Sequence, residues 1–397
     1  LQQVWDYAKR LEGLARNPGV HAAGIVIGDR PLDEYIPLCR GQKNIVVTQY
    51  SMSPLTDLGL LKMDFLALKT LTVIEDASQL IRKKIPDFNI LNIPLDDQDT
   101  FDILNRGETL GVFQVEKPGI TQVCRRFDVR TIEDIIALLA LYRPGPMQFI
   151  PNYIERKKGL QPIEYAHPLL EPICRETYGI LVYQEQVMRA ANVLAGYSLG
   201  QADLLRRAMG KKDKEKMDKE RKNFVEGCKR VNNIPEEQAN AIFDFIAKFA
   251  EYGFNKSHSA AYALICYQTA WLKAHHPVEF FCALLSNEEG KTEKLGSIIA
   301  DCQRVGIQVL PPDINRSELK FTPCVHKGKP AILFGLAAIK NVGAEAIAAA
   351  LRERNTNGPF TSLGEFCARC PDCKRPLLQS LIQAGAFDCL GTPRYLL

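Results

Sequence analysis

The chain has 397 residues, of which 46% are hydrophobic and 24% are charged, and its formal net charge is +4. This composition is typical of a globular protein of two to three domains and excludes a disordered chain. The net charge is too small to indicate nucleic-acid binding by itself, so only local clusters of basic residues can support that function.

The cysteines and the apolar runs indicate the compartment. The 12 cysteines mostly stand singly in apolar surroundings, as Cys124 and Cys266 do, which is typical of reduced thiols. No apolar run reaches the length of a membrane span and no signal peptide opens the chain, so we expect a cytoplasmic protein without membrane contact. Because residue 1 is Leu and already follows a helical pattern, we also expect a fragment of a longer chain.

A small α+β unit is predicted first. Apolar spacing predicts a helix over residues 1–15. Three short strands follow in HAAGIVIG, NIVVTQY and LGLLKMDFL, joined by Pro- and Gly-containing turns in PLDEYIP and SMSPLTD.

The third of these strands carries two opposite charges inside an apolar run. Strand alternation predicts that Lys62 and Asp64 share one face, while Leu61, Met63 and Phe65 enter the core from the other. An ordinary ion pair on a solvated face is one reading of this pattern. The other reading is a carboxylate held on a rigid element for chemistry, with Asp64 as a metal ligand.

The chain becomes mainly helical after Thr70. Helical patterns with acidic or Ser/Thr starts continue to about residue 287, and a further helix leads to the Pro-rich break VLPPDIN. From about Phe321, two short strand candidates precede GLAAIKNVGAEAIAAALRER, which predicts two helices around a tight turn. The predicted fold class is therefore α+β, with a large helical domain.

Several basic residues stand at turns and helix ends. Arg143 directly precedes Pro-Gly-Pro, whose restricted backbone holds a side chain at a rigid corner. In GYSLGQADLLRRAMGKK, Ser198 is a predicted cap for a helix that ends near Gly210. The cations on this helix end and its exit turn, which suit a polyphosphate or nucleic-acid backbone, are Arg206, Arg207, Lys211 and Lys212.

FNKSHSAAYA places Lys256, Ser257 and His258 ahead of an amphipathic helix, where backbone amides and a lysine could meet an anion. A capping Ser with an incidental His is the alternative. The chain has no Walker-type phosphate loop and no dinucleotide Gly fingerprint, so phosphate recognition would depend on side chains.

GLAAIKNVGAEAIAAAL has the outline of a helix-hairpin-helix element, which presents backbone amides to DNA phosphates. Asn341 stands where a hairpin glycine is usual and Gly343 is kept; Asn tolerates the left-handed conformation that such a turn needs. A plain αα-hairpin is the alternative.

Cys367, Cys370 and Cys373 have the two-residue spacing of zinc thiolates. Structural zinc normally has four ligands, and a fourth is not evident unless Cys389 or His326 folds back. The sequence therefore does not favour zinc. An aspartate on a strand, together with clusters of basic residues that could bind phosphates, indicates metal-dependent chemistry on nucleic acid instead. The alternative is DNA binding by the same basic residues without chemistry.

A family resemblance covers nearly the whole chain. The blocks KMDFLALKTLTVI, GVFQVE, ALYRPGPMQ, YGILVYQEQVM, GYSLGQADLLRRAMGKK, YGFNKSHSAAYALICYQTAWLKAHHPVEF and LPPDIN occur in order. They resemble the corresponding blocks of the bacterial DNA polymerase III alpha subunits, the C family of replicative DNA polymerases. The long blocks are too specific for a chance match.

The resemblance implies a nucleotidyltransferase that uses two magnesium ions for DNA replication. Residues 1–69 would be the end of the thumb and the second part of a polymerase-beta-like palm, 70–325 the fingers, and 326–397 a helix-hairpin-helix region. Asp64 would be the third metal-binding aspartate, helping a magnesium ion to activate the primer 3′-hydroxyl, and Lys62 would balance phosphate charge. The other two aspartates would lie before residue 1, so the chain would be inactive alone.

The resemblance also implies ligands and partners. The incoming dNTP and the primer-template backbone would be neutralised by Arg143, Arg206, Arg207, Lys211, Lys212 and Lys256, with Ser257 and His258 beside them. Lys340, Asn341 and Gly343 would contact duplex phosphates. The sliding clamp, a proofreading exonuclease and a clamp-loader subunit would be partners, mostly through regions outside this chain. A non-catalytic DNA-binding or scaffolding module is the alternative function.

Overall fold

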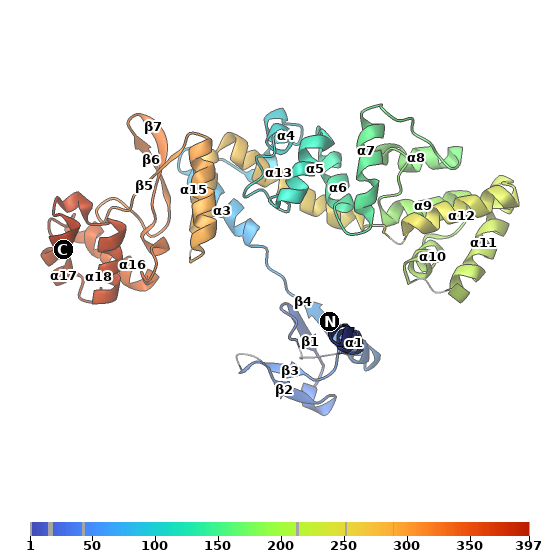
Figure 1. The fold of residues 1–397 in the computed structure, drawn as a ribbon, viewed down its shortest axis with the longest axis horizontal. Helices are drawn as coiled ribbons and strands as arrows, with labels where there is room; N and C mark the ends of the chain where they lie inside the picture. The colour runs from blue at the N-terminus through green and yellow to red at the C-terminus, as the bar shows by residue number, and fades with distance from the viewer. Residues whose placement is uncertain are drawn as a thin grey trace. The chain divides into compact units, whose positions relative to one another are not determined.

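The structure, a computed structural model, describes residues 2–14, 19–41, 44–211, 214–250, 252–288 and 290–396, without the side chains of Lys211 and Lys214. The chain divides into two compact units, Leu1–Leu68 and Lys69–Leu397 (Figure 1). Each unit is described by itself below.

The first unit is small and mixed. Its elements are α1 (Gln2–Leu11), β1 (Gly24–Ile27), β2 (Leu38–Arg40), β3 (Val46–Thr48), α2 (Met52–Asp57) and β4 (Leu61–Asp64). β1 pairs antiparallel with β4, and β2 with β3. The opening helix and the three predicted strands are confirmed, but β2 was not predicted. SMSPLTD is also not a turn: Pro54 lies in the first turn of α2, where a missing N–H breaks no helical hydrogen bond.

One prediction about β4 is wrong. Lys62 and Asp64 do share a face, but Leu61, Met63 and Phe65 are 56%, 42% and 60% exposed rather than buried. The small core of this unit, centred on Ile36, Leu55 and Leu60, packs against Val26, the cross-strand partner of Lys62. The core therefore lies on the Lys62 side of the ribbon, and alternation alone could not choose the side.

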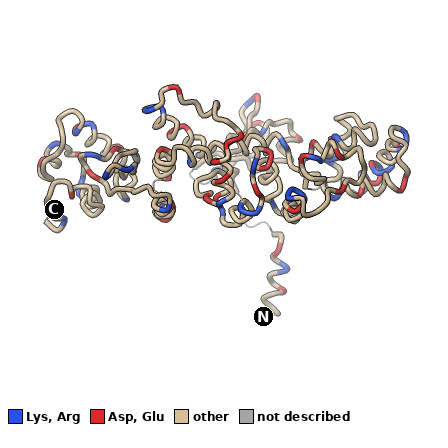
Figure 2. Tube along the Cα trace, turned by 90° about the horizontal axis from the view of Figure 1, so that it is seen from above, with Lys and Arg blue, Asp and Glu red and all other residues tan. Residues whose placement is uncertain are grey.

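The second unit is mainly helical, as predicted. Its helices before the last sheet are α3 (Lys69–Arg82), α4 (Gln98–Asn105), α5 (Pro118–Phe127), α6 (Ile132–Leu141), α7 (Ile150–Lys157), α8 (Glu171–Cys174), α9 (Gln184–Ala195), α10 (Leu199–Lys211), α11 (Lys214–Asn232), α12 (Glu236–Ala250), α13 (Lys256–His275), α14 (Pro277–Ser286) and α15 (Thr292–Arg304). Figure 2 shows acidic and basic residues interspersed along these helices rather than separated.

The long helix α13 organises the helical unit. It packs against α6 and α4, and its residues Ala263, Cys266, Tyr267 and Ala270 are fully buried in the largest core. Toward its C-terminal end the core changes to a second cluster shared by α3, α14 and α15. A helix buried on nearly every side is apolar or small almost all round, which explains why α13 shows little amphipathic periodicity.

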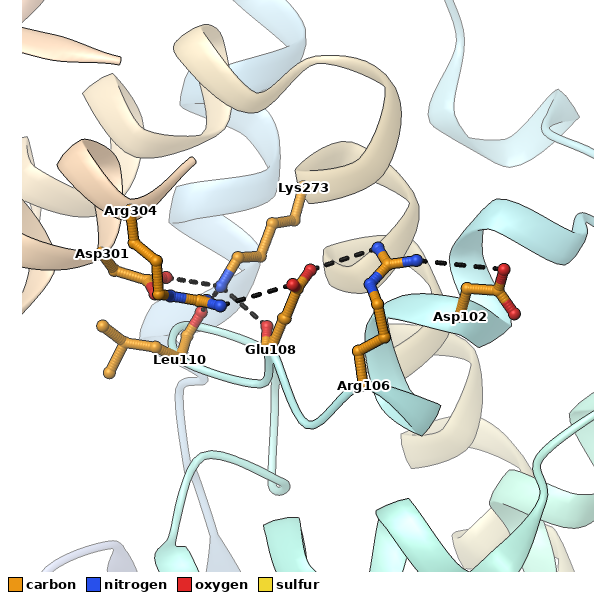
Figure 3. Close-up of polar contacts among 7 residues, drawn as sticks. All are labelled: Asp102, Arg106, Glu108, Leu110, Lys273, Asp301 and Arg304. Carbon is orange, nitrogen blue, oxygen red and sulfur yellow. Dashed lines mark hydrogen bonds and ion pairs between the residues drawn. The ribbon is translucent and has the colours of Figure 1, made fainter. Parts of the chain in front are cut away.

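A charged network joins α13 to α15 and to the loop after α4 (Figure 3). Lys273 Nζ donates to the carbonyl oxygens of Glu108 and Leu110, both at 2.8 Å, and to Asp301 Oδ2 at 2.7 Å. Arg304 donates to Asp301 Oδ1 at 2.6 Å and reaches Glu108 at 3.3 Å. The Lys273 side chain is only 2% exposed, so all three of its hydrogens are used inside the protein.

The last section combines a sheet with helices. β7 (Lys329–Leu333) lies between β5 (Gln308–Leu310), which is parallel to it, and β6 (Thr322–His326), which is antiparallel. The two predicted strands are confirmed. β5 was not predicted, because the two prolines that follow it are typical of a break rather than of a strand. α16 (Ala344–Asn357), α17 (Leu363–Arg369) and α18 (Arg375–Ala384) enclose a third core. The fold is α+β, and none of the described helices combines the length and the apolarity needed to cross a bilayer.

Candidate functional site

Asp64 ends β4 opposite a glycine. Gly24 on β1 is its cross-strand partner, and a Cβ at residue 24 would lie 2.8 Å from Lys62 Cε and 3.2 Å from Asp64 Oδ1. A side chain at this position would therefore push Lys62 and Asp64 aside. The glycine leaves the Asp64 carboxylate open, with 54% of the side chain exposed, on a rigid antiparallel pair.

Lys62 forms an ion pair with Asp64. Its Nζ donates to Asp64 Oδ1 at 2.5 Å, and this hydrogen bond holds the pKa of the Asp64 carboxyl below its ordinary value. The carboxylate is therefore ionised at neutral pH, as a metal ligand must be. Its second oxygen, Oδ2, has no hydrogen-bond partner among the described residues.

His21 lies beside this pair but serves the backbone. Its Nδ1 is 3.8 Å from Asp64 Oδ1 and accepts from the backbone N–H of Gly24 at 2.7 Å and of Ala23 at 3.2 Å. A nitrogen that accepts these bonds carries no proton, so it offers Asp64 no N–H. His21 therefore shapes the loop before β1 rather than pairing with the carboxylate.

The structure brings Lys256, Ser257 and His258 to the start of α13. Asn255 caps the helix by accepting from the His258 backbone N–H at 2.8 Å, and Glu185 on α9 accepts from the Lys256 backbone N–H at 3.1 and 3.0 Å. Side-chain oxygens thus already occupy this helix start. Ser257 is exposed and is not the cap.

The side chains of Lys256 and His258 are each held by neighbouring side chains. Lys256 Nζ binds both oxygens of Glu176 at 2.8 Å and lies 5.2 Å from the centre of the Tyr183 ring. The exposed His258 stacks on Tyr262 with ring centres 4.2 Å apart and meets Phe254 edge-on at 5.1 Å. A flat, positioned imidazole at the surface can donate to a phosphate oxygen.

Arg143 is turned into the protein. Its guanidinium donates to the carbonyl oxygens of Ala140 and Tyr252 at 2.8 and 2.9 Å and lies 4.1 Å from the Phe254 ring centre. Burial lowers the pKa of this guanidinium. Arg143 therefore ties the Pro-Gly-Pro corner to the segment just before α13.

Arg206 and Arg207 share one carboxylate. Asp203, a turn earlier on α10, accepts from Arg206 at 2.6 Å and from Arg207 at 2.8 Å. The group keeps one net positive charge. Ser198 caps this helix as predicted, but α10 continues through Gly210 to Lys211. The side chain of Lys211 and the whole of Lys212 lie outside the described residues.

The predicted hairpin is present in altered form. Asn341 is left-handed, with φ of 63°, as expected, and Gly343 precedes α16 without a side-chain cap. The helix before the turn is a single 3-10 turn, Leu336–Ala338, and not the predicted full helix. Leu336 N–H donates to the carbonyl of Glu318, so its amide is used by another loop. Lys340 and Asn341 are exposed.

The three-cysteine segment is divided between surface and core. Cys370 and Cys373 are buried in the third core, whereas Cys367 is exposed. Across the described part of the chain, the only group of three or more His, Cys, Asp or Glu side chains close enough to share a metal is Asp97, Asp99 and His275. Asp97 Oδ2 already accepts from Thr100 and lies 2.9 Å from His275, so that group is explained as a helix cap.

Sequence reasoning missed the acidic partners of the cations. Asp203 could have been found, because it stands three and four residues before Arg206 and Arg207 on a predicted helix. Glu176 and Glu185 could not, because they are 80 and 71 positions from Lys256.

Three family models match the chain. The bacterial DNA polymerase III alpha NTPase domain matches residues 1–67, the bacterial DNA polymerase III alpha subunit finger domain matches 70–232, and a helix-hairpin-helix motif matches 306–397.

The relatives are DNA polymerase III alpha subunits. Those of Thermus aquaticus, Escherichia coli and Bacillus subtilis are 52%, 46% and 45% identical over 98%, 98% and 99% of this chain. The matches cover 32%, 34% and 35% of those proteins, so the chain spans about a third of the length of these relatives.

Proposed function

Because the chain belongs to the bacterial DNA polymerase III alpha subunit family, we propose that it takes part in template-directed DNA synthesis during chromosome replication. The reaction is nucleotidyl transfer from a dNTP to a primer 3′-hydroxyl. The substrates are primer-template DNA and dNTPs, and other replisome subunits are the partners. Residues 1–69 would form part of the palm, 70–325 the fingers and 326–397 the helix-hairpin-helix region.

The observation that carries the proposal is the Asp64 carboxylate. It is ionised, it keeps Oδ2 without a protein donor among the described residues, and Gly24 leaves space beside it. These properties fit a ligand of a divalent ion, for which we propose Mg²⁺. When bound, such ions lower the pKa of a hydroxyl and stabilise the charge of phosphoryl oxygens.

One carboxylate does not hold two ions, since hard cations take several oxygen ligands each. Asp64 therefore supplies one ligand, and further carboxylates would come from outside the described residues of this unit. Lys62 orients the Asp64 carboxylate through its hydrogen bond and lowers the pKa of its carboxyl.

The cations of the helical unit suit phosphate binding in the same reaction. Arg206 and Arg207 are held by one shared Asp203, which orders both guanidinium groups yet leaves a net positive charge. Lys256 is held by Glu176 beside the exposed His258 and Ser257. We assign these residues, together with Lys211 and Lys212, to the dNTP and the primer-template backbone. Arg143, whose guanidinium bonds to two carbonyl oxygens, would hold the segment before α13 in place for that contact.

The hairpin suits contact with duplex DNA. Gly343 leaves the start of α16 without a side-chain cap, and Lys340 is exposed beside it. Backbone amides and one lysine in this arrangement bind phosphates without reading bases. We therefore assign Lys340, Asn341 and Gly343 to backbone contacts.

The test is primer extension by an intact polymerase that carries this segment, with Asp64→Asn. Losing a metal ligand removes several kcal/mol of transition-state stabilisation, so extension should fall by at least about a hundredfold. DNA affinity, measured by fluorescence anisotropy, should stay within about twofold, because a carboxylate does not attract phosphate. Asp57→Asn, an exposed aspartate of the same unit, is the matched control and should extend normally.

A non-catalytic DNA-binding role is the second candidate. It is favoured by the surroundings of Asp64, which belongs to no group of three or more closely spaced His, Cys, Asp or Glu side chains among the described residues. In that case Asp64→Asn would extend primers as fast as the wild type. That result would contradict the catalytic assignment and leave Lys62 and Asp64 as a surface ion pair.

A further inference from the structure

A cavity of 690 Å³ lies in the helical unit where α4, α5 and α7 end and α6 begins. None of its residues belongs to the cation groups assigned above. It is lined by Asn105, Arg125, Asp128, Arg130, Thr131, Asp134, Lys157, Lys158 and Tyr178.

The cavity lining includes a buried ion pair whose hydrogen bonds are all made within the protein. Lys157 Nζ contacts Asp134 Oδ1 at 2.7 Å, and both side chains are less than 10% exposed (8% and 7%). Asp134 Oδ2 accepts from the backbone N–H of Arg130 and Thr131 at 2.9 and 3.2 Å, and Lys157 also donates to the Asp128 carbonyl. Neither charge of this pair needs a ligand, so the pair fixes the shape of the site.

Two basic side chains of the lining have no acidic partner among the described residues. The lining holds four basic and two acidic residues, and Asp134 and Asp128 are engaged by Lys157 and Arg130 respectively. Within the described residues, no hydrogen bond or ion pair engages the side chains of Arg125 or Lys158, and both are exposed at the rim. The cavity therefore carries a surplus of two positive charges.

The backbone holds the walls in place. Gly107 has φ of +70°, and a Cβ there would overlap the Arg125 side chain, so Arg125 lies directly on the backbone of Gly107. On the other wall, Tyr178 is left-handed, with φ of 52°, and its carbonyl accepts from Arg156 at 3.0 Å. Its ring meets Tyr153 edge-on at 5.0 Å. The cations thus face a supported cavity and not a flexible loop.

We propose that this cavity binds the phosphate group of a phosphorylated ligand. Arg125 and Lys158 both line this cavity, and a guanidinium and an ammonium match the charge of a phosphate, which arginine can bind through two parallel hydrogen bonds. The cavity has the volume of small-molecule sites, and the Tyr178 ring provides one apolar wall. The phosphate can belong to a free small molecule or to a nucleic-acid strand, which present the same oxygens. The inference does not depend on Asp64 or on the cations assigned to DNA synthesis.

The test uses two probes on the full chain. Pyrophosphate binding is measured by calorimetry, and a fluorescein-labelled oligo(dT) is titrated by anisotropy at several salt concentrations. The test variant is Arg125→Gln with Lys158→Gln. The control is Arg126→Gln with Lys83→Gln, which removes the same charge from two exposed residues of the same unit that do not line the cavity.

Affinity for at least one probe should fall at least about fivefold further in the test variant than in the control. For oligo(dT), two lost phosphate contacts should also reduce the slope of log K against log salt by about 1.4. Both pairs are exposed side chains without carboxylate partners among the described residues, so thermal melts should match the wild type.

The outcomes separate the sources of the phosphate. Pyrophosphate binding that the test variant weakens and the control does not identifies a free phosphorylated molecule as the ligand. Weakened oligo(dT) binding without any pyrophosphate binding identifies a nucleic-acid strand. Equal affinities of the test and control variants for both probes, or no binding of either probe by the wild type, would overturn the proposal. The Asp64→Asn extension assay is unaffected by either result.

Discussion

The two units of this chain use ion pairs in opposite ways. Lys62 and Asp64 pair at 2.5 Å on a thin ribbon, where the carboxylate stays 54% exposed. Lys273 and Asp301 pair at 2.7 Å in the helical unit, where the side chains are 2% and 9% exposed. Every donor of Lys273 is used by the protein, whereas Asp64 keeps one oxygen free of protein donors in the described residues.

The hydrophobic cores of the two units also differ in extent, and the first unit again has the more exposed side chains. Among its described residues, the first unit has three buried apolar side chains in its core, and its β1–β4 ribbon exposes Ile25, Leu61 and Met63. The helical unit has extensive cores around α13 and α14. A buried ion pair whose hydrogen bonds are all made within the protein holds its elements together, whereas an exposed pair leaves an oxygen available for a ligand.

The largest expected effect is at the buried joint. Lys273→Met removes the ammonium and leaves Asp301 Oδ2 and two carbonyl oxygens without their donor, which should cost about 3–5 kcal/mol of unfolding free energy. The chain has two tryptophans, Trp5 in the first unit and Trp271 on α13, so a Trp5→Phe background reports on the helical unit alone. Urea unfolding followed by Trp271 fluorescence measures the cost.

The matched control for this variant is Lys83→Met, an exposed lysine after α3, which should change the unfolding free energy by less than about 0.5 kcal/mol. If Lys273→Met were as mild as the control, the network in Figure 3 would not be a structural joint.

A second prediction compares the two cores directly. Leu138 on α6 is 0% exposed in the largest core, and Leu138→Ala should cost about 3 kcal/mol because its close-packed neighbours cannot fully fill the space left. Leu55→Ala, in the small core of the first unit, should cost about 2 kcal/mol. Trp271 fluorescence measures the first cost, and hydrogen exchange of the β4 amides measures the second. Equal costs would mean that the first unit is packed as tightly as the second.

The smallest effect is expected at an exposed network near the C-terminal end. Glu365 accepts from the Thr361 hydroxyl and backbone N–H and from Arg369, and these bonds lower the pKa of its carboxyl to about 2. A lowered folded-state pKa means that the stabilisation is complete above the ordinary value of 4.5 and is lost as the pH falls toward 2.

The difference in melting temperature between the wild type and Glu365→Gln should therefore be larger at pH 6 than at pH 3. Glu345→Gln, on the first turn of α16, has no hydrogen-bonded partner in the described residues and serves as the control. If the difference in melting temperature between the wild type and Glu365→Gln did not change with pH, the hydrogen bonds of Glu365 would contribute no pH-dependent stability.

Much of the fold could be predicted from local patterns. Apolar spacing and capping residues identified the second unit as mainly helical and gave many of its helices, and the Ser198 cap was predicted correctly. Local patterns failed where distant contacts decide. SMSPLTD has turn residues but forms α2. Leu336 begins only a 3-10 turn, and its backbone N–H donates to the carbonyl of Glu318 in another loop.

The sequence by itself determined many of the helices and strands, the candidate residues of the site and the family, because these depend on local spacing and on long ordered motifs. It also determined that Lys62 and Asp64 share a face, since strand side chains alternate. Only the tertiary structure decided which face covers the core, that Arg143 bonds to the carbonyl of Tyr252, and that Arg125 and Lys158 share a cavity rim. These facts depend on contacts between segments far apart in the chain, which no local pattern records.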